Sequence, residues 1–139
     1  MDGVISGRTI RPPRVVLYAK DGMGKTTWAA GADRPIFLPT EEGADEVGVD
    51  RFPLLDTFPV CLAALGKVAK GDHDYGTVVV DSLDWLERLI HAEVCAKRGV
   101  ETMEDVGYGK AFTFALTQWR EFLAAKERSV GFAGGLEAL

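Results

Sequence analysis

The chain has 139 residues, of which 47% are hydrophobic and 27% are charged, and its formal net charge is -5 at pH 7. This composition predicts one globular domain and excludes an intrinsically disordered chain. The longest apolar run, residues 60–65, is far shorter than the roughly 20 residues that span a bilayer, and the amino terminus lacks a secretory pattern. We expect no membrane partner. The negative charge also disfavours a nucleic-acid binder that depends on overall positive charge.

Two cysteines, Cys61 and Cys95, have no partners at metal-ligand spacing. Neither a disulfide framework nor a zinc site is therefore expected. We interpret both as buried thiols of a protein in a reducing cytosol.

The first third of the chain predicts a strand, a glycine-rich loop and a short helix. Residues 14–19 (RVVLYA) form a β-branched and aromatic run typical of a buried strand. The helix begins at Lys25 and ends near Ala30, before Gly31. A second short apolar segment covers residues 35–39, and the acidic residues that follow it predict a solvated loop.

The middle of the chain predicts a helix, a buried strand and another helix. The first helix covers residues 59–70, capped by Thr57 and ended by Gly71. Residues 77–81 (TVVVD) are typical of a strand buried on both faces in a parallel sheet. The next helix ends at Gly99, and its apolar positions are Leu83, Leu86, Ile90 and Val94.

A glycine-containing connection over residues 101–109 leads to a long predicted helix from Lys110 to about residue 128. Its apolar stripe is Phe112, Leu116, Trp119 and Leu123, which we expect to face the core. Alternating strands and helices predict an α/β domain with a mainly parallel sheet flanked by helices.

The segment AKDGMGKT at residues 19–26 matches the phosphate-binding loop G-x-x-x-x-G-K-[ST], except for alanine at the first glycine position. Lys25 would reach the β- and γ-phosphates of ATP, and the Thr26 hydroxyl would ligate Mg²⁺. The alternative is a glycine-rich turn with a solvated lysine. The nucleotide-binding residues expected here are Lys20, Asp21, Gly22, Met23, Gly24, Lys25, Thr26 and Thr27.

A carboxylate is also needed to organise the magnesium ion. Asp81 ends the TVVVD strand, where such a residue commonly stands in a Walker B pattern. It could instead cap the following helix. Glu41, after residues 35–39, is the candidate general base, with Glu42 as the weaker candidate; the alternative is an acidic surface loop.

The combination of this loop with TEEG, VVVDSLDW and GYGK resembles the phage-type RecA-like AAA ATPases, which include the Sak-type single-strand annealing proteins of bacteriophages. The resemblance implies a P-loop NTPase fold, with Glu41 as catalytic base and Asp81 and Ser82 as the family's aspartate-serine pair. It also implies ATP and Mg²⁺ as cofactors, single-stranded DNA as a partner, homo-oligomers, and a bacterial cytosol with a phage or prophage context.

The family continues beyond the region of resemblance with a further buried strand that ends in a polar sensor residue. We therefore expect a core over residues 14–128 that lacks its C-terminal strands, after an N-terminal extension (1–13) and before a flexible or divergent tail (129–139). Unpaired groups on buried strands cost about 1–3 kcal/mol each. The chain is accordingly expected to be a truncated gene product or fragment, with Val130 to Ala133 a poor replacement strand.

The remaining signals are weaker. Tyr108, beside Lys110, could stack on a base, although a structured connection is the simpler interpretation. His73 and His91 are isolated and predict structural positions. The tryptophans are expected to be core or interface anchors: Trp28, Trp85 and Trp119.

Three functional hypotheses follow. The first is an ATP- and Mg²⁺-binding module of DNA recombination, repair or replication that hydrolyses ATP in its intact form, with Lys25 and Glu41 as catalytic residues. The second is a non-catalytic nucleotide-binding or oligomer-capping module. The third, a metabolic kinase, is disfavoured because no lid with clustered arginines follows the loop.

Overall fold

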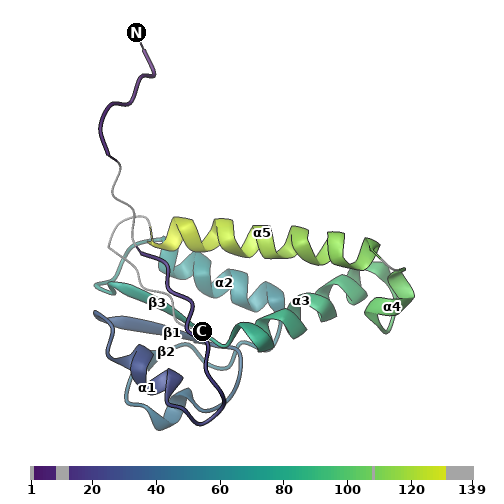
Figure 1. Cartoon of the computed structure of the whole chain (residues 1–139), viewed down its shortest axis with the longest axis horizontal. Coiled ribbons are helices and arrows are strands. Elements are labelled where there is room, and N and C mark those ends of the chain that lie inside the picture. The colour runs from purple at the N-terminus through teal and green to yellow at the C-terminus, as the bar shows by residue number, and fades with distance from the viewer. Residues whose placement is uncertain (1, 9–12, 108, 131–139) are drawn as a thin grey trace.

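The computed structural model describes residues 2–8, 13–107 and 109–130, and of residues 126–130 it describes the backbone alone. Figure 1 shows a small parallel sheet with α1 on one side and the longer helices on the other. In chain order the elements are α1 (Lys25–Ala30), β1 (Pro35–Pro39), the 3-10 helix η1 (Ala44–Glu46), β2 (Asp50–Arg51), α2 (Phe58–Ala69), β3 (Thr77–Asp81), α3 (Leu83–Arg98), α4 (Met103–Val106) and α5 (Lys110–Val130).

The described strands form a sheet of order β2-β1-β3, in which both pairings are parallel. In the central pairing Ile36 lies opposite Val78 and Pro39 lies opposite Asp81. The carboxyl ends of β1 and β3 are therefore level, so the residues that follow them emerge at one edge of the sheet. The predicted α/β architecture with a parallel sheet and flanking helices is confirmed.

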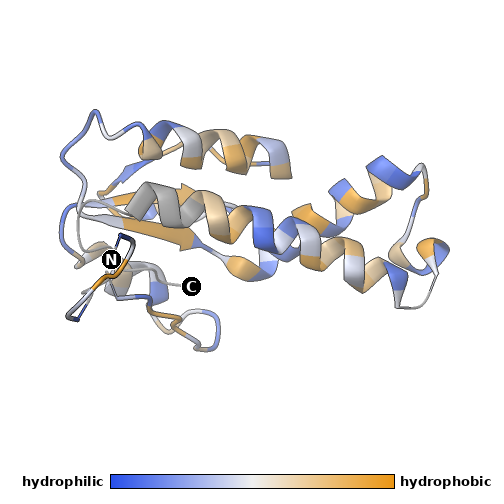
Figure 2. Cartoon of the chain, turned by 90° about the horizontal axis from the view of Figure 1, so that it is seen from above, coloured by the Kyte–Doolittle hydropathy of each residue, from blue (hydrophilic) through white to orange (hydrophobic). Residues whose placement is uncertain are grey.

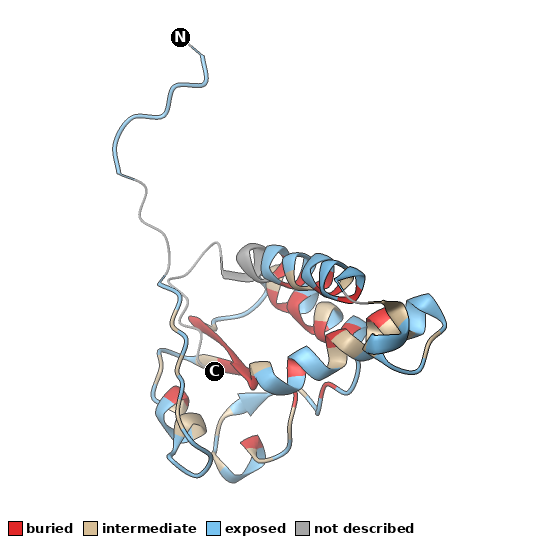
Figure 3. Ribbon diagram, turned by 45° about the vertical axis from the view of Figure 1, so that its right-hand side comes forward, coloured by how far each residue is buried: buried red, intermediate tan, exposed pale blue. Residues whose placement is uncertain are grey.

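The two faces of the sheet bury different amounts of apolar surface. Because successive strand residues point to opposite faces, Ile36 and Val80 face one core while Phe37 and Val79 face the other. The first core also contains side chains of α2, α3 and α5. Within the described part of the chain, the buried residues of the second are the two strand residues with Ala29 of α1 and Ala44 of η1, and Ala30 and Val49 pack against them. Figure 3 shows the buried positions on the strands and on the inward sides of the helices.

The predicted helix ends are confirmed where local chemistry sets them. The Thr57 side chain accepts a hydrogen bond from the backbone N–H of Val60 at 3.3 Å, which caps α2. Gly99 ends α3 in the left-handed conformation with φ 65°. Leu86, Ile90 and Val94 of α3 are fully buried, as their spacing predicted.

The prediction of a buried strand at residues 14–19 is wrong. None of these residues belongs to a strand, and Val16 and Tyr18 are 69% and 95% exposed. A β-strand is held by ladder hydrogen bonds to a neighbour and by burial of its side chains, and this segment gains neither from the part of the chain that is described. β-branched composition alone does not create a strand.

The predicted core face of α5 is also wrong. Phe112, Leu116 and Leu123 are 65%, 47% and 44% exposed. The buried positions lie on a different face and repeat at intervals of three and four: Ala111, Ala115, Gln118, Phe122 and Ala125. Three alanines on this face allow α5 to approach α2 and α3 closely, because short side chains at the contact permit a short distance between the helix axes. Of the predicted stripe, only Trp119 is partly buried, and it packs against the first core, which is the larger of the two and is called the large core below.

Three further elements were not predicted. η1 and β2 lie within or next to the acidic stretch that was expected to be only a loop, and α4 lies within the connection before α5. Figure 2 shows hydrophobic residues, coloured orange, on the strands and a mixture of hydrophilic and hydrophobic residues along α5. Tyr108 and residues 131–139 lie outside the described residues. Among the described helices, none is long and apolar enough to cross a membrane.

Candidate nucleotide-binding site

The glycine-rich loop presents main-chain N–H donors that bond to none of the described residues. Gly22 and Gly24 adopt φ values of 77° and 86°, which side chains other than glycine rarely adopt. Among the described residues, no group accepts a hydrogen bond from the N–H groups of Gly22, Gly24, Lys25 or Thr26. Convergent main-chain N–H groups in a turn that leads into a helix are the usual recognition element for phosphate oxygens.

The Lys25 ammonium group is held within the loop. Its Nζ donates to the carbonyl oxygen of Ala19 at 2.8 Å and lies 3.6 Å from the Asp21 carboxylate. The Asp21 side chain is fully exposed, so this ion pair contributes little to stability. A phosphate that enters the loop can therefore replace Asp21 as the partner of the ammonium group at a small cost in free energy.

The Thr26 hydroxyl donates a hydrogen bond to the Asp81 carboxylate at 2.7 Å. Thr26 lies in the first turn of α1, and Asp81 is the last residue of β3 and is 7% exposed. Residues 55 positions apart in the sequence thus meet at the carboxyl edge of the sheet. The structure brings together the two residues that the sequence singled out for a metal ion.

These two side chains suit Mg²⁺. A hydroxyl and a carboxylate are hard oxygen donors, and Mg²⁺ in nucleotide sites takes only one or two protein oxygens beside water and phosphate. Accordingly, no cluster of three or more histidine, cysteine, aspartate or glutamate side chains capable of holding a metal occurs within the described ranges. A donor set of one hydroxyl and one carboxylate fits an ion that is shared with a bound nucleotide.

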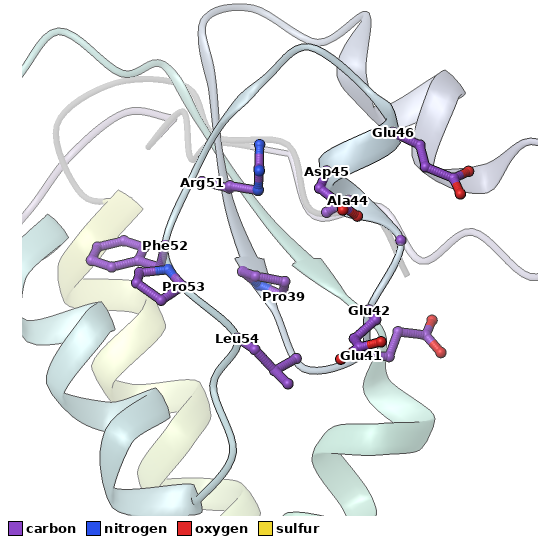
Figure 4. Close-up of a pocket in the computed structure, with 11 residues that line it drawn as sticks. Pro39, Glu41, Glu42, Ala44, Asp45, Glu46, Arg51, Phe52, Pro53 and Leu54 are labelled. Atoms are coloured by element: carbon purple, nitrogen blue, oxygen red, sulfur yellow. The ribbon is translucent and has the colours of Figure 1, made fainter.

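Glu41 and Glu42 emerge at the same edge, after β1. Glu41 is half-buried and Glu42 is exposed. Both line a cavity of about 530 Å³ between the β1–η1 connection and the segment after β2. Figure 4 shows this cavity with Arg51 and the apolar side chains of Phe52, Pro53 and Leu54 opposite the acidic residues.

This cavity is separate from the phosphate loop, because no residue of the loop lines it. Among the described residues that line it, four are acidic, Glu41, Glu42, Asp45 and Glu46, and one is basic, Arg51. Such a lining would repel a triphosphate. The loop, and not the cavity, is therefore the candidate phosphate site. Among the described residues no hydrogen bond connects the Glu41 carboxylate to the loop.

A buried polar group at this edge was missed by sequence reasoning. Thr40 and Ser82, which follow β1 and β3, are 5% and 8% exposed and hydrogen-bond to each other. A threonine between a strand and two glutamates carries no signal in the sequence that distinguishes it from a loop residue. Its role depends on the parallel pairing that places it beside Ser82.

The other singled-out side chains lie in varied surroundings. Cys61 is buried, whereas Cys95 is partly exposed, so the prediction that both are buried holds only for Cys61. His73 Nε2 lies 2.8 Å from the carbonyl oxygen of Val68, and His91 lies 3.7 Å from Glu87 on α3. The tryptophans are partly exposed: Trp28, Trp85 and Trp119.

Comparison with known proteins agrees with this geometry. A family model described as the AAA domain matches residues 11–129, which is most of the chain, and the chain belongs to this family. Among curated proteins, it is similar to the SPbeta prophage-derived uncharacterized protein YorG of Bacillus subtilis (strain 168), with 26% identity over 113 residues. The match covers 77% of this chain and 35% of that protein, so the chain matches about a third of the relative's length. No solved structure matches the chain.

Proposed function

We propose that this chain is a RecA-like, ATP-binding module of the phage recombination type, which binds Mg²⁺-ATP at the loop of residues 20–27. In its intact form the module hydrolyses ATP in DNA recombination, repair or replication. The observation that carries this proposal is the 2.7 Å hydrogen bond between Thr26 and Asp81, next to four main-chain N–H groups that have no acceptor in the described part of the chain. Membership of the AAA domain family supports the nucleotide, and the prophage-derived relative supports the phage context.

The residues of the loop divide the work of binding the phosphates. The free N–H groups hold phosphate oxygens, and Lys25 exchanges the Ala19 carbonyl for the β- and γ-phosphates. Thr26 and Asp81 would hold the metal through the oxygen of the Thr26 hydroxyl and the carboxylate of Asp81, which lie in hydrogen-bond contact. When bound, Mg²⁺ neutralises charge on the phosphate oxygens. Glu41 accepts a proton from the attacking water.

Nucleotide binding can be tested on the purified chain with a fluorescent ATP analogue. Lys25→Ala removes the charged donor and should weaken binding about 10–100-fold, the range expected for loss of a hydrogen bond to a charged group. Lys67→Ala on α2 is the matched control, since Lys67 is exposed on the opposite side of the sheet. Equal affinity of the wild type and Lys25→Ala would refute the site.

Hydrolysis is tested by a second matched pair. Glu41→Gln should keep nucleotide affinity and lower turnover by about 10²–10⁴-fold, the usual contribution of a general base. Glu42→Gln, one residue further along the same cavity edge, should retain turnover. Equal losses in both variants would contradict the assignment of Glu41.

A second candidate is a module that binds nucleotide without hydrolysing it, as a regulatory or oligomer-capping unit. One observation favours it: among the described residues, no hydrogen bond connects Glu41 to the loop, and Glu41 lines a cavity to which the loop contributes no residue. Nucleotide binding without turnover, together with no change on adding single-stranded DNA, would select this candidate. Stimulation of turnover by single-stranded DNA would select the first.

A further inference from the structure

Thr40 connects the ends of the two central strands through three short hydrogen bonds. Its hydroxyl donates to the carbonyl oxygen of Ser82 at 2.6 Å and accepts from the N–H of Ser82 at 2.8 Å. Its own N–H donates to the carbonyl oxygen of Asp81 at 2.8 Å. Because Thr40 is 5% exposed, little water competes for these bonds.

These bonds fix the residues on either side of the Asp81–Ser82 peptide. Ser82 is the N-cap of α3, and its carbonyl oxygen also accepts from the N–H of Leu86. Thr40 therefore ties the end of β1 to the point at which β3 stops and α3 begins. Asp81, in turn, accepts the Thr26 hydroxyl at 2.7 Å. One residue thus holds the backbone that carries the carboxylate facing the loop: the Thr40 side chain binds the main chain of Ser82, and the Thr40 main-chain N–H binds the carbonyl of Asp81.

We propose that Thr40 is a positioning residue that orients the Asp81 carboxylate for a metal ion while touching neither metal nor nucleotide. This inference rests on the proposed Mg²⁺-nucleotide site. Partners that orient a metal ligand typically affect metal affinity 10–100-fold when they are removed. Thr40 also immediately precedes Glu41, so the same three bonds fix the backbone from which Glu41 emerges.

Substitutions at Thr40 separate its hydroxyl from its shape. Thr40→Val keeps the branched shape but leaves the buried N–H of Ser82 without an acceptor. Thr40→Ser keeps the hydroxyl and loses one methyl group. Thr40→Cys provides a weaker donor and acceptor of similar size and serves if Thr40→Val does not fold.

The test measures affinity of the full chain for a fluorescent ATP analogue with Mg²⁺ and with EDTA. The ratio of the two affinities is the gain due to metal. Thr40→Val should lower this gain about tenfold or more and change the metal-free affinity less than about twofold. Thr40→Ser should retain the gain, and Thr40→Cys should fall between them. In an Asp81→Asn background, Thr40→Val should cause no further loss, because its effect passes through Asp81.

Each other outcome overturns the inference. An unchanged gain in Thr40→Val, or in Thr40→Cys if Thr40→Val is unfolded, shows that the hydroxyl does not position Asp81. Equal loss with and without metal shows a purely structural role, as does full additivity with Asp81→Asn. A wild-type chain that binds no nucleotide refutes the proposed function itself and the inference with it. Wild-type binding with an unaffected Thr40→Val refutes the inference alone.

Discussion

The two faces of the sheet differ in how firmly they are held. Among the described residues, sixteen buried residues form a continuous core on one face, fifteen of them from the strands and from α2, α3 and α5 and one, Leu55, from the connection before α2. On the other, four buried residues hold α1 and η1, and therefore the phosphate loop, against β1 and β3. The proposed site is built on the thinly packed face. Segments with few buried contacts open at low free energy, so ligand binding is expected to order this side more than the other.

The largest effect on stability is expected from shortening a side chain that α5 contributes to the large core. Phe122→Ala should lower the free energy of unfolding by about 3–5 kcal/mol, because Phe122 is 2% exposed and leaves a cavity. Phe112→Ala, the same change on the same helix at a position 65% exposed, should cost less than about 1 kcal/mol. Urea denaturation measures both. Equal costs would show that the described face of α5 is wrong.

A smaller effect is expected from comparing neighbouring valines on β3, which face opposite cores. Val80→Ala should destabilise the chain by about 2–3 kcal/mol, and Val79→Ala by roughly 1–2 kcal/mol, because α1 can move to fill the smaller cluster. Hydrogen exchange provides the sharper readout. Val79→Ala should increase amide exchange in α1 and leave α5 unchanged, whereas a uniform increase over the chain would contradict two separately held faces.

The smallest effect is a difference in thiol reactivity between Cys61 and Cys95, which involves no change in stability at neutral pH. Burial in the large core raises the pKa of the Cys61 thiol from 9.0 to about 11. At pH 8 the thiolate fraction of Cys61 is thus on the order of 10⁻³, so iodoacetamide should modify Cys95 well before Cys61. Because the folded pKa exceeds the unfolded one, stability should fall as pH rises from about 9 to 11, and Cys61→Ala should reduce that fall. Rapid modification of Cys61 at pH 8 would contradict its burial.

Local chemistry in the sequence sufficed for most elements. The Thr57 cap, the glycine after α3 and the three consecutive valines of β3 act within a few residues, and their predictions are confirmed. Residues 14–19 failed because a strand requires a partner from elsewhere in the chain. The face of α5 failed because its alanines are less hydrophobic than Phe112 and Leu116, although they pack closer. The contacts of Thr40 could not be predicted, because they depend on the register of β1 and β3.

Part of the candidate site could also be predicted from the sequence. The glycine-lysine-threonine loop is a contiguous pattern, and Asp81 ends a recognisable strand, so both could be proposed as site residues from the sequence. Their contact at 2.7 Å depends on tertiary structure that no spacing rule contains. The cavity beside Glu41 and its separation from the loop required coordinates as well.

The central claim is that Thr26 and Asp81 together hold one Mg²⁺ ion for a nucleotide in the loop. Isothermal titration of ATP with and without Mg²⁺, on the wild type, Thr26→Val, Asp81→Asn and the double variant, tests it most directly. Each single variant should lose most of the metal-dependent gain in affinity, and the double variant should lose little more, since both side chains serve one ion. Additive losses, or a full gain in both single variants, would contradict a shared ion.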